Sequence, residues 1–470
     1  MARNVASLLD AVARRRVQET ALAWDGGALT WSELDRRAGG VARVLARQGI
    51  RPGDTVALAL PNGWPFVAAL WGGLKLGAIV APFNPLLTPE ERARILEHLE
   101  PKLVVHDVGT EEAPRIRAAD PTAPALILYT SGSTGQPKGA VLSHAAVRAA
   151  NQSWVGPVMR LTPADTVLAA LPLAHSFGLN GALLAPLLAG AGVVLMERFS
   201  PDEVLEAIAR HRVTVLPGVA TMFRRLLDAP AFGAADLSSL RLAVSGAAPC
   251  PWELAHEWRG RTGVRMLRGY GMTELFRPVS YLADDPRDLE DAVGRPVPGV
   301  EIQVVDEAGQ PVGDGEVGEL WINTPAAMEG YLHAPEETRA VLEGGWFKTG
   351  DLGTVSPDGF VRIAGRKREL ILRGGYSVVP GEVEAVLLTH PAVAEAAAVG
   401  LPHAELGEEV AAFVTLRPAT QVAPNELITY CKERLAAFKY PRHVSILDRL
   451  PKSPTGKILK ARLWVQAIRG

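Results

Sequence analysis

The chain has 470 residues and a formal charge of −2, and 48% of its residues are hydrophobic. One hydrophobic core rarely serves a chain of this length, so we expect at least two domains. The near-neutral charge, without a basic stripe, argues against a nucleic-acid-binding protein. The two cysteines, Cys250 and Cys431, lack metal-ligand spacing and are predicted to be buried thiols in a reducing cytosol.

The N-terminus is rich in arginine, but Asp10 and Glu19 and the lack of a long apolar stretch distinguish it from a targeting peptide. We predict an ordinary amphipathic helix there. The most apolar run, residues 178–196, contains Asn180, Pro186 and four glycines. It is therefore interpreted as a core helix followed by a buried strand and not as a membrane span. A soluble, cytoplasmic protein is expected.

Up to about residue 300, helical patterns alternate with short strands rich in β-branched residues. This alternation predicts an α/β fold in which mostly parallel sheets are covered by helices. The predicted strands are 55–60, 78–81, 213–216 and 240–245, and the predicted helices are 68–76, 88–99 and 201–210.

After residue 300 the pattern changes to strands separated by turns such as Asp358-Gly359, at 301–306, 318–323, 353–356 and 359–363. These strands predict an antiparallel sheet or small β-barrel-like subdomain that closes the large domain. A small α+β unit follows, with helices at 381–389 and 424–435 and strands at 393–399, 409–416 and 443–447. We expect a large domain over residues 1–366 and a small domain over residues 367–470.

Residues 125–144, ALILYTSGSTGQPKGAVLSH, are the most informative segment. A short apolar strand enters a loop of small and hydroxyl residues that carries Lys138, and an amphipathic stretch begins near Ser143. Backbone N–H groups, hydroxyls and an ammonium can converge there on a polyphosphate. Pro137 stands where a Walker A helix would begin, so this is a different type of phosphate loop. The alternative is a flexible Gly/Ser surface loop.

Two further segments place a carboxylate near an aromatic residue and a glycine. In GYGMTE, Tyr270 can stack on a base, and Glu274 is a hard-oxygen ligand suited to Mg²⁺. In WFKTGD, Asp351 can accept both hydroxyls of a ribose, and Arg366 can bind the same ribose or a phosphate. Core packing, turns and surface ion pairs are the alternatives for each residue taken alone.

His175 lies in the apolar segment LPLAHSFG, where it is either structural or able to orient a carboxylate or gate a tunnel. Lys457 lies in the basic tail PKSPTGKILK. Such a tail is normally solvated, but a mobile lysine can also stabilise the charge that develops at an α-phosphate.

In this order the motifs resemble those of the adenylate-forming superfamily, which contains acyl-CoA synthetases, carrier-protein adenylation domains and luciferases. The resemblance covers almost the whole chain. It rests on YTSGSTGQPKG, LPLAHSFG, SGAAP, GYGMTE, GELWINTPAAMEGY, FKTGDLG, GRKRELILRGGYSVVPGEVE and PTGK.

The resemblance implies that a carboxylic acid is adenylated by Mg·ATP and that a thiol, normally that of CoA, then displaces AMP. It implies catalytic roles for Lys457, His175, Glu274 and Thr130, and a Mg²⁺ site at Thr130 and Glu274. Nucleotide and CoA contacts are implied at Thr130, Ser131, Gly132, Ser133, Thr134, Gly135, Lys138, Gly246, Ala247, Ala248, Tyr270, Gly271, Met272, Thr273, Asp351, Arg366, Gly374, Gly375, Lys439 and Arg442.

Some positions depart from the family pattern. The hinge between the domains is most often Asp or Lys in relatives, and Arg368 occupies it here. Ser377 replaces an Asn that follows the double glycine in many synthetases. Tyr440 replaces a basic residue found in some aryl-CoA ligases, which leaves Lys439 and Arg442 as the expected contacts for the CoA phosphates.

Ser176 stands where adenylation domains for α-amino acids carry an Asp, so an amino-acid substrate is not expected. The predicted acid pocket is mostly apolar and suits an aliphatic or aromatic tail. Its expected lining is Phe177, Asn180, Val219 to Met222, Ala247, Met272 and Leu275 to Pro278. Within that lining, Arg277 either binds a second carboxylate of the substrate or faces solvent.

Three functions follow from these observations. A ligase for CoA and a fatty or aryl acid is the first. A ligase for an acyl-carrier protein and a degenerate nucleotide-binding protein are the alternatives; Lys457, Glu274 and Asp351 argue against the degenerate protein. The expected partners are the acid, ATP and CoA, with no nucleic acid and no integral membrane segment, and a homodimer is a further expectation.

Overall fold

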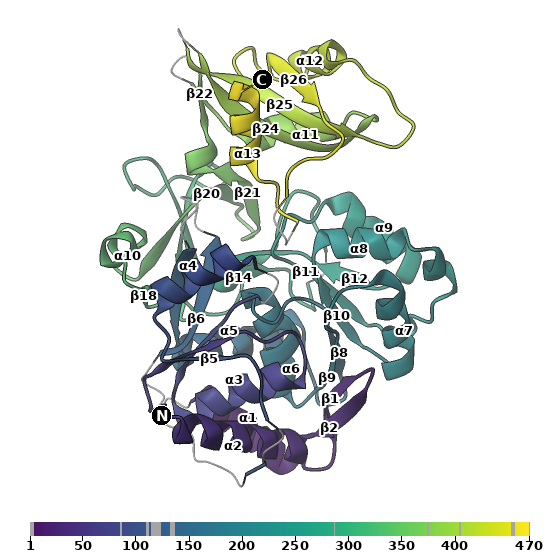
Figure 1. Cartoon of the computed structure of the whole chain (residues 1–470). Coiled ribbons are helices and arrows are strands. Elements are labelled where there is room, and N and C mark those ends of the chain that lie inside the picture. Colours follow the sequence, from purple (N-terminus) through teal and green to yellow (C-terminus); the bar gives the residue numbers. More distant parts are fainter. Residues whose placement is uncertain are drawn as a thin grey trace. The chain divides into compact units, whose positions relative to one another are not determined.

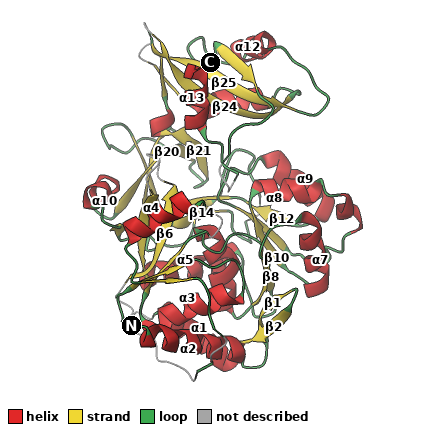
Figure 2. Cartoon of the chain, in the orientation of Figure 1, coloured by secondary structure: helices red, strands yellow, loops and turns green. Residues whose placement is uncertain are grey.

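The structure is a computed structural model, and it describes residues 4–84, 87–109, 112–113, 124–131, 137–285, 287–373, 376–403, 406–452 and 456–469. The chain divides into two compact units. The first comprises Met1–Glu301 and Ile322–Phe347, and the second comprises Ile302–Trp321 and Lys348–Gly470. Figure 1 labels the elements of both units, and Figure 2 separates helices from strands by colour.

One sheet of the first unit has the strand order β12-β11-β10-β8-β9-β1-β2. Neighbouring strands are parallel from β12 to β1, and the β1–β2 hairpin at the edge is antiparallel. The central strands are apolar and fully buried because helices cover both faces of a parallel sheet. The strands are β1 (Thr20–Trp24), β2 (Gly27–Thr30), β8 (Thr166–Ala169), β9 (Gly192–Leu195), β10 (Val215–Gly218), β11 (Leu242–Ser245) and β12 (Arg265–Leu267).

A second sheet of this unit has the order β18-β7-β6-β4-β3-β5. Strands β5, β3, β4 and β6 are parallel, whereas β7 is antiparallel to β6 and β18 is antiparallel to β7. The predicted α/β fold with mostly parallel sheets is therefore confirmed. The strands are β3 (Thr55–Leu58), β4 (Ile79–Pro82), β5 (Leu103–Val105), β6 (Pro124–Ser131), β7 (Pro137–Ser143) and β18 (Gly330–Tyr331).

The helices of the first unit begin where the sequence provides N-caps. Thr30 and Thr88 each form a capping box with the glutamate three residues later, and the Ser143 hydroxyl accepts from the Ala146 N–H. The helices are α1 (Val5–Arg15), α2 (Trp31–Arg47), α3 (Trp64–Leu76), α4 (Pro89–Leu99), α5 (His144–Ser153), α6 (Ala185–Ala189), α7 (Pro201–His211), α8 (Ala220–Leu227), α9 (Trp252–Thr262) and α10 (Pro335–Val341). Short π-helices at Trp154–Val158 and Gly178–Leu184 and a 3₁₀-helix at Pro230–Ala234 complete the set.

A buried ion cluster joins α1, α2 and α3. The Lys75 ammonium, fully buried, lies 2.8 Å from Asp10 Oδ1 and also contacts Asp35. The charges offset one another's desolvation, so removal of one partner would leave an uncompensated buried charge. The predicted amphipathic first helix is confirmed as α1, and Asp10 on it belongs to this cluster.

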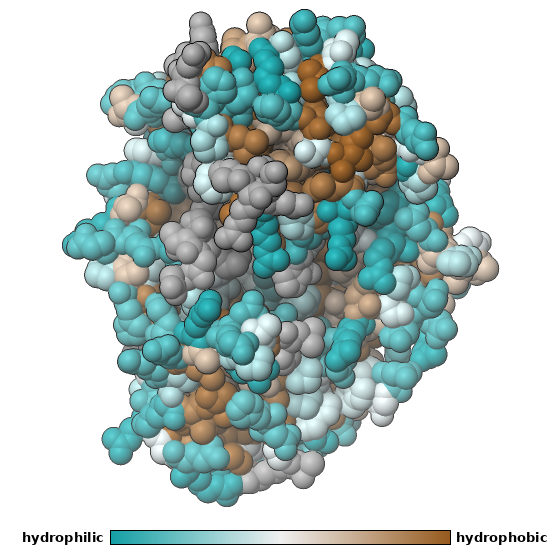
Figure 3. Space-filling view, turned by 45° about the horizontal axis from the view of Figure 1, so that its top comes forward, coloured by the Kyte–Doolittle hydropathy of each residue, from teal (hydrophilic) through white to brown (hydrophobic). Residues whose placement is uncertain are grey.

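The apolar run at 178–196 forms a π-helix, then α6, then the buried strand β9, as predicted. Among the described residues, no helix combines the length and apolar character needed to cross a bilayer. One face of the chain, drawn in Figure 3, is largely hydrophilic with smaller hydrophobic areas. Both cysteines are free thiols; Cys431 is buried as predicted, whereas Cys250 is only partly buried because it follows the end of β11.

The second unit contains two sheets. In the first, β20 (Trp346–Val355) pairs antiparallel with β21 (Val361–Arg366), in line with the predicted strand-and-turn block. The other sheet has the order β23-β22-β25-β24, with β26 beside β25. The remaining elements are β16 (Glu301–Val305), β17 (Gly318–Asn323), β22 (Ile371–Arg373), β23 (Tyr376–Val378), β24 (Val393–His403), β25 (Gly407–Leu416), β26 (His443–Ile446), α11 (Pro380–Leu388), α12 (Pro424–Lys432), α13 (Lys460–Arg469) and a 3₁₀-helix at Lys367–Glu369. The short strand β19 (Leu342–Glu343) belongs to the first unit.

Strands β24 and β25 bury both of their faces. Because successive side chains of a strand point to opposite faces, Ala396 and Ala398 pack with residues of α11 and α12, whereas Ala397 and Val399 pack with Leu463 of α13. This explains why the segment consists of small apolar residues without alternation. The predicted α+β character of this region is confirmed. The division at 366/367 and the hinge at Arg368 concern motion and stay predictions.

Candidate active site

Three of the motifs and one segment of the predicted acid pocket follow four neighbouring strands of one parallel sheet. Strands β8, β10, β11 and β12 lie side by side, with Gly218 opposite Ser245 and Val244 opposite Leu267. The segments that follow these strands carry, in the same order, His175, Val219, Gly246 and Gly269. Since the carboxyl ends of parallel strands meet at one edge of a sheet, where ligands of α/β proteins collect, the four segments share that edge.

The turn after β11 is narrow and strained. The Gly246 N–H donates to the Gly218 carbonyl at 3.3 Å, and Ala247 has a left-handed backbone with φ of +62°. A Cβ atom at Gly246 would lie 2.9 Å from Arg277 Nη1 and 3.2 Å from the Phe177 ring, so a larger residue would displace the guanidinium. A non-glycine residue in this conformation is typical of functional turns. Gly246, Ala247 and Ala248 therefore form a tight loop at the sheet edge.

The GYGMTE motif forms an antiparallel hairpin of β13 (Gly269–Met272) and β14 (Phe276–Ser280), to which β15 (Arg295–Pro296) is added. A Cβ atom at Gly271 would lie 2.0 Å from the Phe276 carbonyl oxygen, which explains this glycine. Met272, Thr273 and Glu274 lie at or next to the turn, and Tyr270, half-buried, pairs with Val279. The hairpin thus presents the predicted base-stacking ring and the predicted magnesium ligand on one rigid element.

Lys138 lies on a strand and not in the loop, which corrects the expectation of a strand–loop–helix unit. Strand β7 is interposed between the loop and α5, and Lys138 is directly opposite Thr130 on β6. Pro137 stops a helix here, and the apolar residues that follow pair with β6 instead. Gly132, Ser133, Thr134 and Gly135 lie outside the described residues, and only the backbone of Ser131 is described.

Tyr331 brings the predicted phosphate lysine and the predicted magnesium ligand together. Its hydroxyl donates to Glu274 Oε1 at 2.8 Å, and the Lys138 ammonium lies 5.3 Å from the centre of its ring. The Met328 N–H also donates to the Glu274 carbonyl oxygen, and Lys138 forms an ion pair with Glu337. Tyr331 lies within the motif GELWINTPAAMEGY, but nothing in the sequence assigned it a role.

A second polar cluster lies beside this one. His98 Nδ1 is 2.9 Å from the Tyr129 hydroxyl, and the rings of His98 and His333 meet edge to face at 5.7 Å. Burial and the neighbouring His333 lower the pKa of His98, and burial raises the pKa of Tyr129. Both groups are therefore neutral at pH 7. Sequence reasoning did not find this cluster, because its members lie on α4, β6 and the segment after β18.

His175 follows β8 and is held in one tautomer. The Phe177 N–H donates to His175 Nδ1 at 3.3 Å, so the ring carries its proton on Nε2. Burial lowers the pKa of His175, which favours this neutral form. Phe177 in turn stacks on Trp154, with the ring centres 5.7 Å apart. The histidine is thus a neutral donor beside an aromatic wall.

In the second unit, Asp351 and Arg366 are cross-strand partners on β20 and β21. Arg366 Nε lies 2.9 Å from Asp351 Oδ1, and the Asp351 side chain is buried. The Thr349 hydroxyl accepts from the Asp351 N–H at 3.0 Å. The two residues predicted to hold a ribose are therefore assembled as one ion pair, in which the arginine orients the carboxylate.

The other predicted residues of this unit lie on separate segments of the chain. The Lys439 ammonium pairs with Glu382, and Arg442 donates to the carbonyl oxygens of Ala437 and Tyr440. Lys457 is exposed and directly precedes the bridge between Ile458 and Lys452. Gly374 and Gly375 lie outside the described residues.

The donors present fit a magnesium ion that is held mainly by substrate phosphates. Within the described ranges, no three His, Cys, Asp or Glu side chains gather as a metal cage. Glu274 supplies one carboxylate, with Oε1 bonded to Tyr331, and the Thr130 hydroxyl is half-buried on β6. One carboxylate plus phosphate oxygens is the ligand set typical of Mg²⁺ in nucleotide enzymes.

Comparison with known proteins gives the same family over nearly the full length. Residues 9–123 and 106–332 match a family model described as AMP-binding enzyme, and residues 382–457 match the AMP-binding enzyme C-terminal domain. A feruloyl-CoA synthase from Amycolatopsis is 35% identical over 481 residues, covering 96% of each chain. A sulfoacetate–CoA ligase from Cupriavidus necator is 35% identical, covering 93% of this chain and 92% of the relative.

Among solved structures, ATP-bound MatB from Rhodopseudomonas palustris superposes with a TM-score of 0.93 at 31% identity, covering 99% of both chains. The agreement extends over the whole chain, so the order of the motifs and the fold point to the same family.

Proposed function

This chain belongs to the AMP-binding enzyme family and is an AMP-forming acid–CoA ligase that uses ATP, Mg²⁺ and CoA, and we propose how its residues divide the work. The reaction has two halves. In the first, a carboxylate oxygen of the acid attacks the α-phosphorus of ATP, and the bond to pyrophosphate breaks. In the second, the CoA thiol attacks the acyl carbon, and AMP leaves.

In the first half-reaction, Lys138 and the backbone and hydroxyls of residues 130–135 would bind the phosphates. Lys138 would exchange its exposed partner Glu337 for the phosphates, while the Tyr331 ring keeps the ammonium in place. Gly246 to Ala248 and Tyr270 would hold the adenine, and Asp351 with Arg366 would bind the ribose. Positioning and charge neutralisation provide most of the catalysis in such displacements.

Glu274 and Thr130 would hold the magnesium ion, which neutralises phosphate charge when bound. Tyr331 keeps the Glu274 carboxylate oriented through the hydrogen bond to Oε1. Lys457 would place its ammonium on the charge that develops at the α-phosphate. The hairpin that carries Glu274 is tightly packed, which suits a metal ligand in a fixed position. Lys457 is exposed, which suits a cation that moves.

For the second half-reaction we propose a change in the orientation of the C-terminal region about Arg368. Lys457 would leave the site, and the segment with Gly374 and Gly375 would take part in thiol entry. Lys439 and Arg442 would contact the CoA phosphates. His175, neutral and donating through Nε2, would line the passage between acid and thiol.

The observation that carries these assignments is that the segments after β8, β10, β11 and β12 share one edge of the sheet. The contact of Tyr331 with both Glu274 and Lys138 supports them, because it brings the predicted metal ligand and the predicted phosphate ligand together. The relatives named above act on acids as different as ferulate and sulfoacetate, and Ser176 disfavours an α-amino acid. A cytoplasmic location and a homodimer are also proposals.

The test is to mix the purified protein with ATP, Mg²⁺ and a panel of acids, and to follow pyrophosphate release with and without CoA. We expect release with some acids and thioester formation when CoA is added. Accumulation of acyl-AMP that CoA does not relieve would indicate a carrier-protein acceptor. No release with any acid would contradict the assignments.

A further inference from the structure

Arg277 is a buried cation that the reaction above does not use. Its side chain lies on β14, and the residue is 8% exposed. Its guanidinium donates to the Ser280 hydroxyl at 3.0 Å, to the Ser245 carbonyl at 2.9 Å and to the Leu267 carbonyl at 3.5 Å. All three acceptors are neutral. The expectation that Arg277 faces solvent is therefore wrong.

No carboxylate compensates this charge among the described residues. Burial away from water lowers the pKa of Arg277 to about 9, and only the Cys250 sulfur opposes the shift electrostatically. A guanidinium has five N–H donors, and the three bonds above leave two of them for another acceptor. Buried charges are normally paired, so these two donors suit an anionic group that the described residues do not supply.

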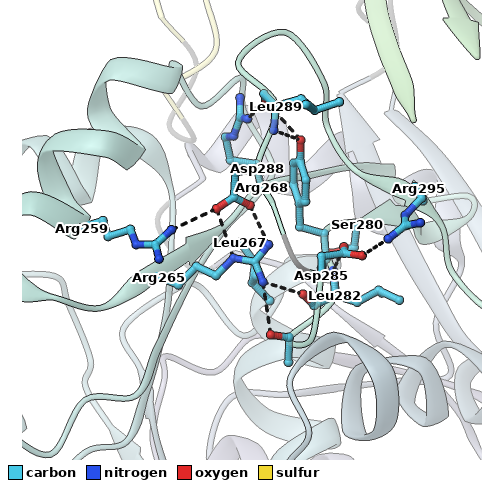
Figure 4. A network of polar contacts seen from close by, with 12 residues as sticks. Arg259, Arg265, Leu267, Arg268, Ser280, Leu282, Asp285, Asp288, Leu289 and Arg295 are labelled. Carbon is cyan, nitrogen blue, oxygen red and sulfur yellow. Dashed lines mark hydrogen bonds and ion pairs between the residues drawn. The ribbon is translucent and has the colours of Figure 1, made fainter. Parts of the chain in front are cut away.

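Three more exposed arginines of the same unit pair with carboxylates, whereas Arg268, which is buried like Arg277, donates to backbone carbonyls. In Figure 4, Arg265 and Arg259 point at Asp288, and Arg295 points at Asp285. The Arg265 bond is bidentate, at 3.1 and 2.7 Å. Within the described part of the chain, Arg277 has hydroxyl and carbonyl partners and a cation–π contact with the Trp154 ring at 5.1 Å.

The surroundings place this cation on the wall of the predicted acid pocket. Phe177 stacks on Trp154; the Phe177 ring lies beside Gly246, and the Trp154 ring faces the guanidinium. Cβ atoms at Gly246 and Gly269 would lie 2.9 and 2.3 Å from the guanidinium nitrogens, so the two glycines make room for it. These glycines belong to the segments after β11 and β12, at the sheet edge where the other motifs meet.

We propose that Arg277 binds a second anionic group of the acid substrate, so that this ligase prefers an acid with a carboxylate or sulfonate at the far end of its acyl chain. The inference rests on the proposed function. The guanidinium fork matches two oxygens of such a group, and the aromatic wall of Trp154 and Phe177 contacts the carbon skeleton between the two ends.

The experiment compares matched acids of equal length on the wild-type enzyme, measuring kcat/KM for pyrophosphate release. The pairs are glutarate with valerate, terephthalate with p-toluate, and 3-sulfopropionate with butyrate. We expect the dianionic member of at least one pair to be preferred by about 10- to 100-fold, the range for a hydrogen-bonded charge. The carboxylate and sulfonate pairs distinguish the two sources of the anion.

Arg277→Met should abolish this preference, and Arg277→Lys should retain part of it. Arg268→Met is the matched control, because Arg268 is equally buried and donates to the Leu289 and Glu290 carbonyls in the network of Figure 4. It should leave the preference unchanged.

Activity on the monoanionic acids, with no pair favouring its dianionic member, would overturn the inference and leave the proposed function standing. This comparison uses only the wild-type enzyme, so it tests the inference even if Arg277→Met does not fold. No pyrophosphate from any acid would overturn both.

Discussion

Replacing Tyr331 by phenylalanine removes a single hydroxyl that connects two predicted parts of the active site. The hydroxyl donates to Glu274 Oε1 at 2.8 Å, whereas the ring, which carries the cation–π contact with Lys138, is retained. The variant thus isolates the hydrogen bond to the predicted magnesium ligand from the contact with the phosphate lysine.

The expected size of the effect follows from the exposure of this pair. A hydrogen bond to a charged group contributes about 1.5 to 3 kcal/mol. Glu274 is half-buried and water can replace part of the lost bond, so we expect the lower end. About 1.5 kcal/mol corresponds to a roughly tenfold slower adenylation step. Because the hydroxyl orients the metal ligand, the Mg²⁺ concentration for half-maximal rate should rise, while KM for the acid stays constant.

The assay is single-turnover formation of acyl-AMP at a series of Mg²⁺ concentrations. Tyr281→Phe is the matched control, because the Tyr281 hydroxyl bonds to the backbone of Leu289 and not to Glu274. It should lower stability without changing the Mg²⁺ dependence. A Tyr331→Phe enzyme with the wild-type rate and the wild-type Mg²⁺ dependence would refute the role given to this contact.

Three further predictions follow. Lys457→Ala should abolish acyl-AMP formation but spare thioester formation from supplied acyl-AMP, whereas Lys452→Ala, nearby on the same tail, should spare both. Equal loss in both half-reactions would contradict the proposed change of orientation between them. Burial lowers the pKa of His144 from 6.5 to about 4, and its Nδ1 accepts the Val5 N–H at 3.3 Å only when unprotonated. As the pH falls, the unfolded chain therefore binds the proton before the folded chain does. About 3 kcal/mol of folding stability should be present above pH 6.5 and lost as the pH falls to 4. In urea unfolding, the stability of His144→Gln should depend less on pH than that of the wild type, and an unchanged dependence would assign the loss of stability to another group. Lys75→Met should lower the free energy of unfolding by about 3 to 5 kcal/mol, because it leaves the buried Asp10 and the partly buried Asp35 without their cation. A change below about 1 kcal/mol in the same urea assay would show that these carboxylates do not depend on Lys75.

Several local features could be predicted because they depend on neighbouring residues. The alternation of helical patterns with short β-branched strands predicted helix α4 and the parallel strands β3, β10 and β11. The strand before the phosphate loop was also predicted, and it is confirmed as β6. The sequence did not predict that Lys138 lies on a strand. Strand β7 forms only by pairing with β6, and the pattern GAVL does not distinguish a strand from the end of a loop.

By itself the sequence determined the family, the α/β class and the order of the chemical motifs, because these depend on residue type and spacing along the chain. Only the tertiary structure decided which side chains meet. Tyr331 reaches Glu274 across 57 residues through the pairing of β18 with β7. Arg277 points inward because Gly246 and Gly269, at the ends of other strands, leave room for its guanidinium. Such contacts depend on strand order and register, which are set by packing of the whole unit and by no local pattern.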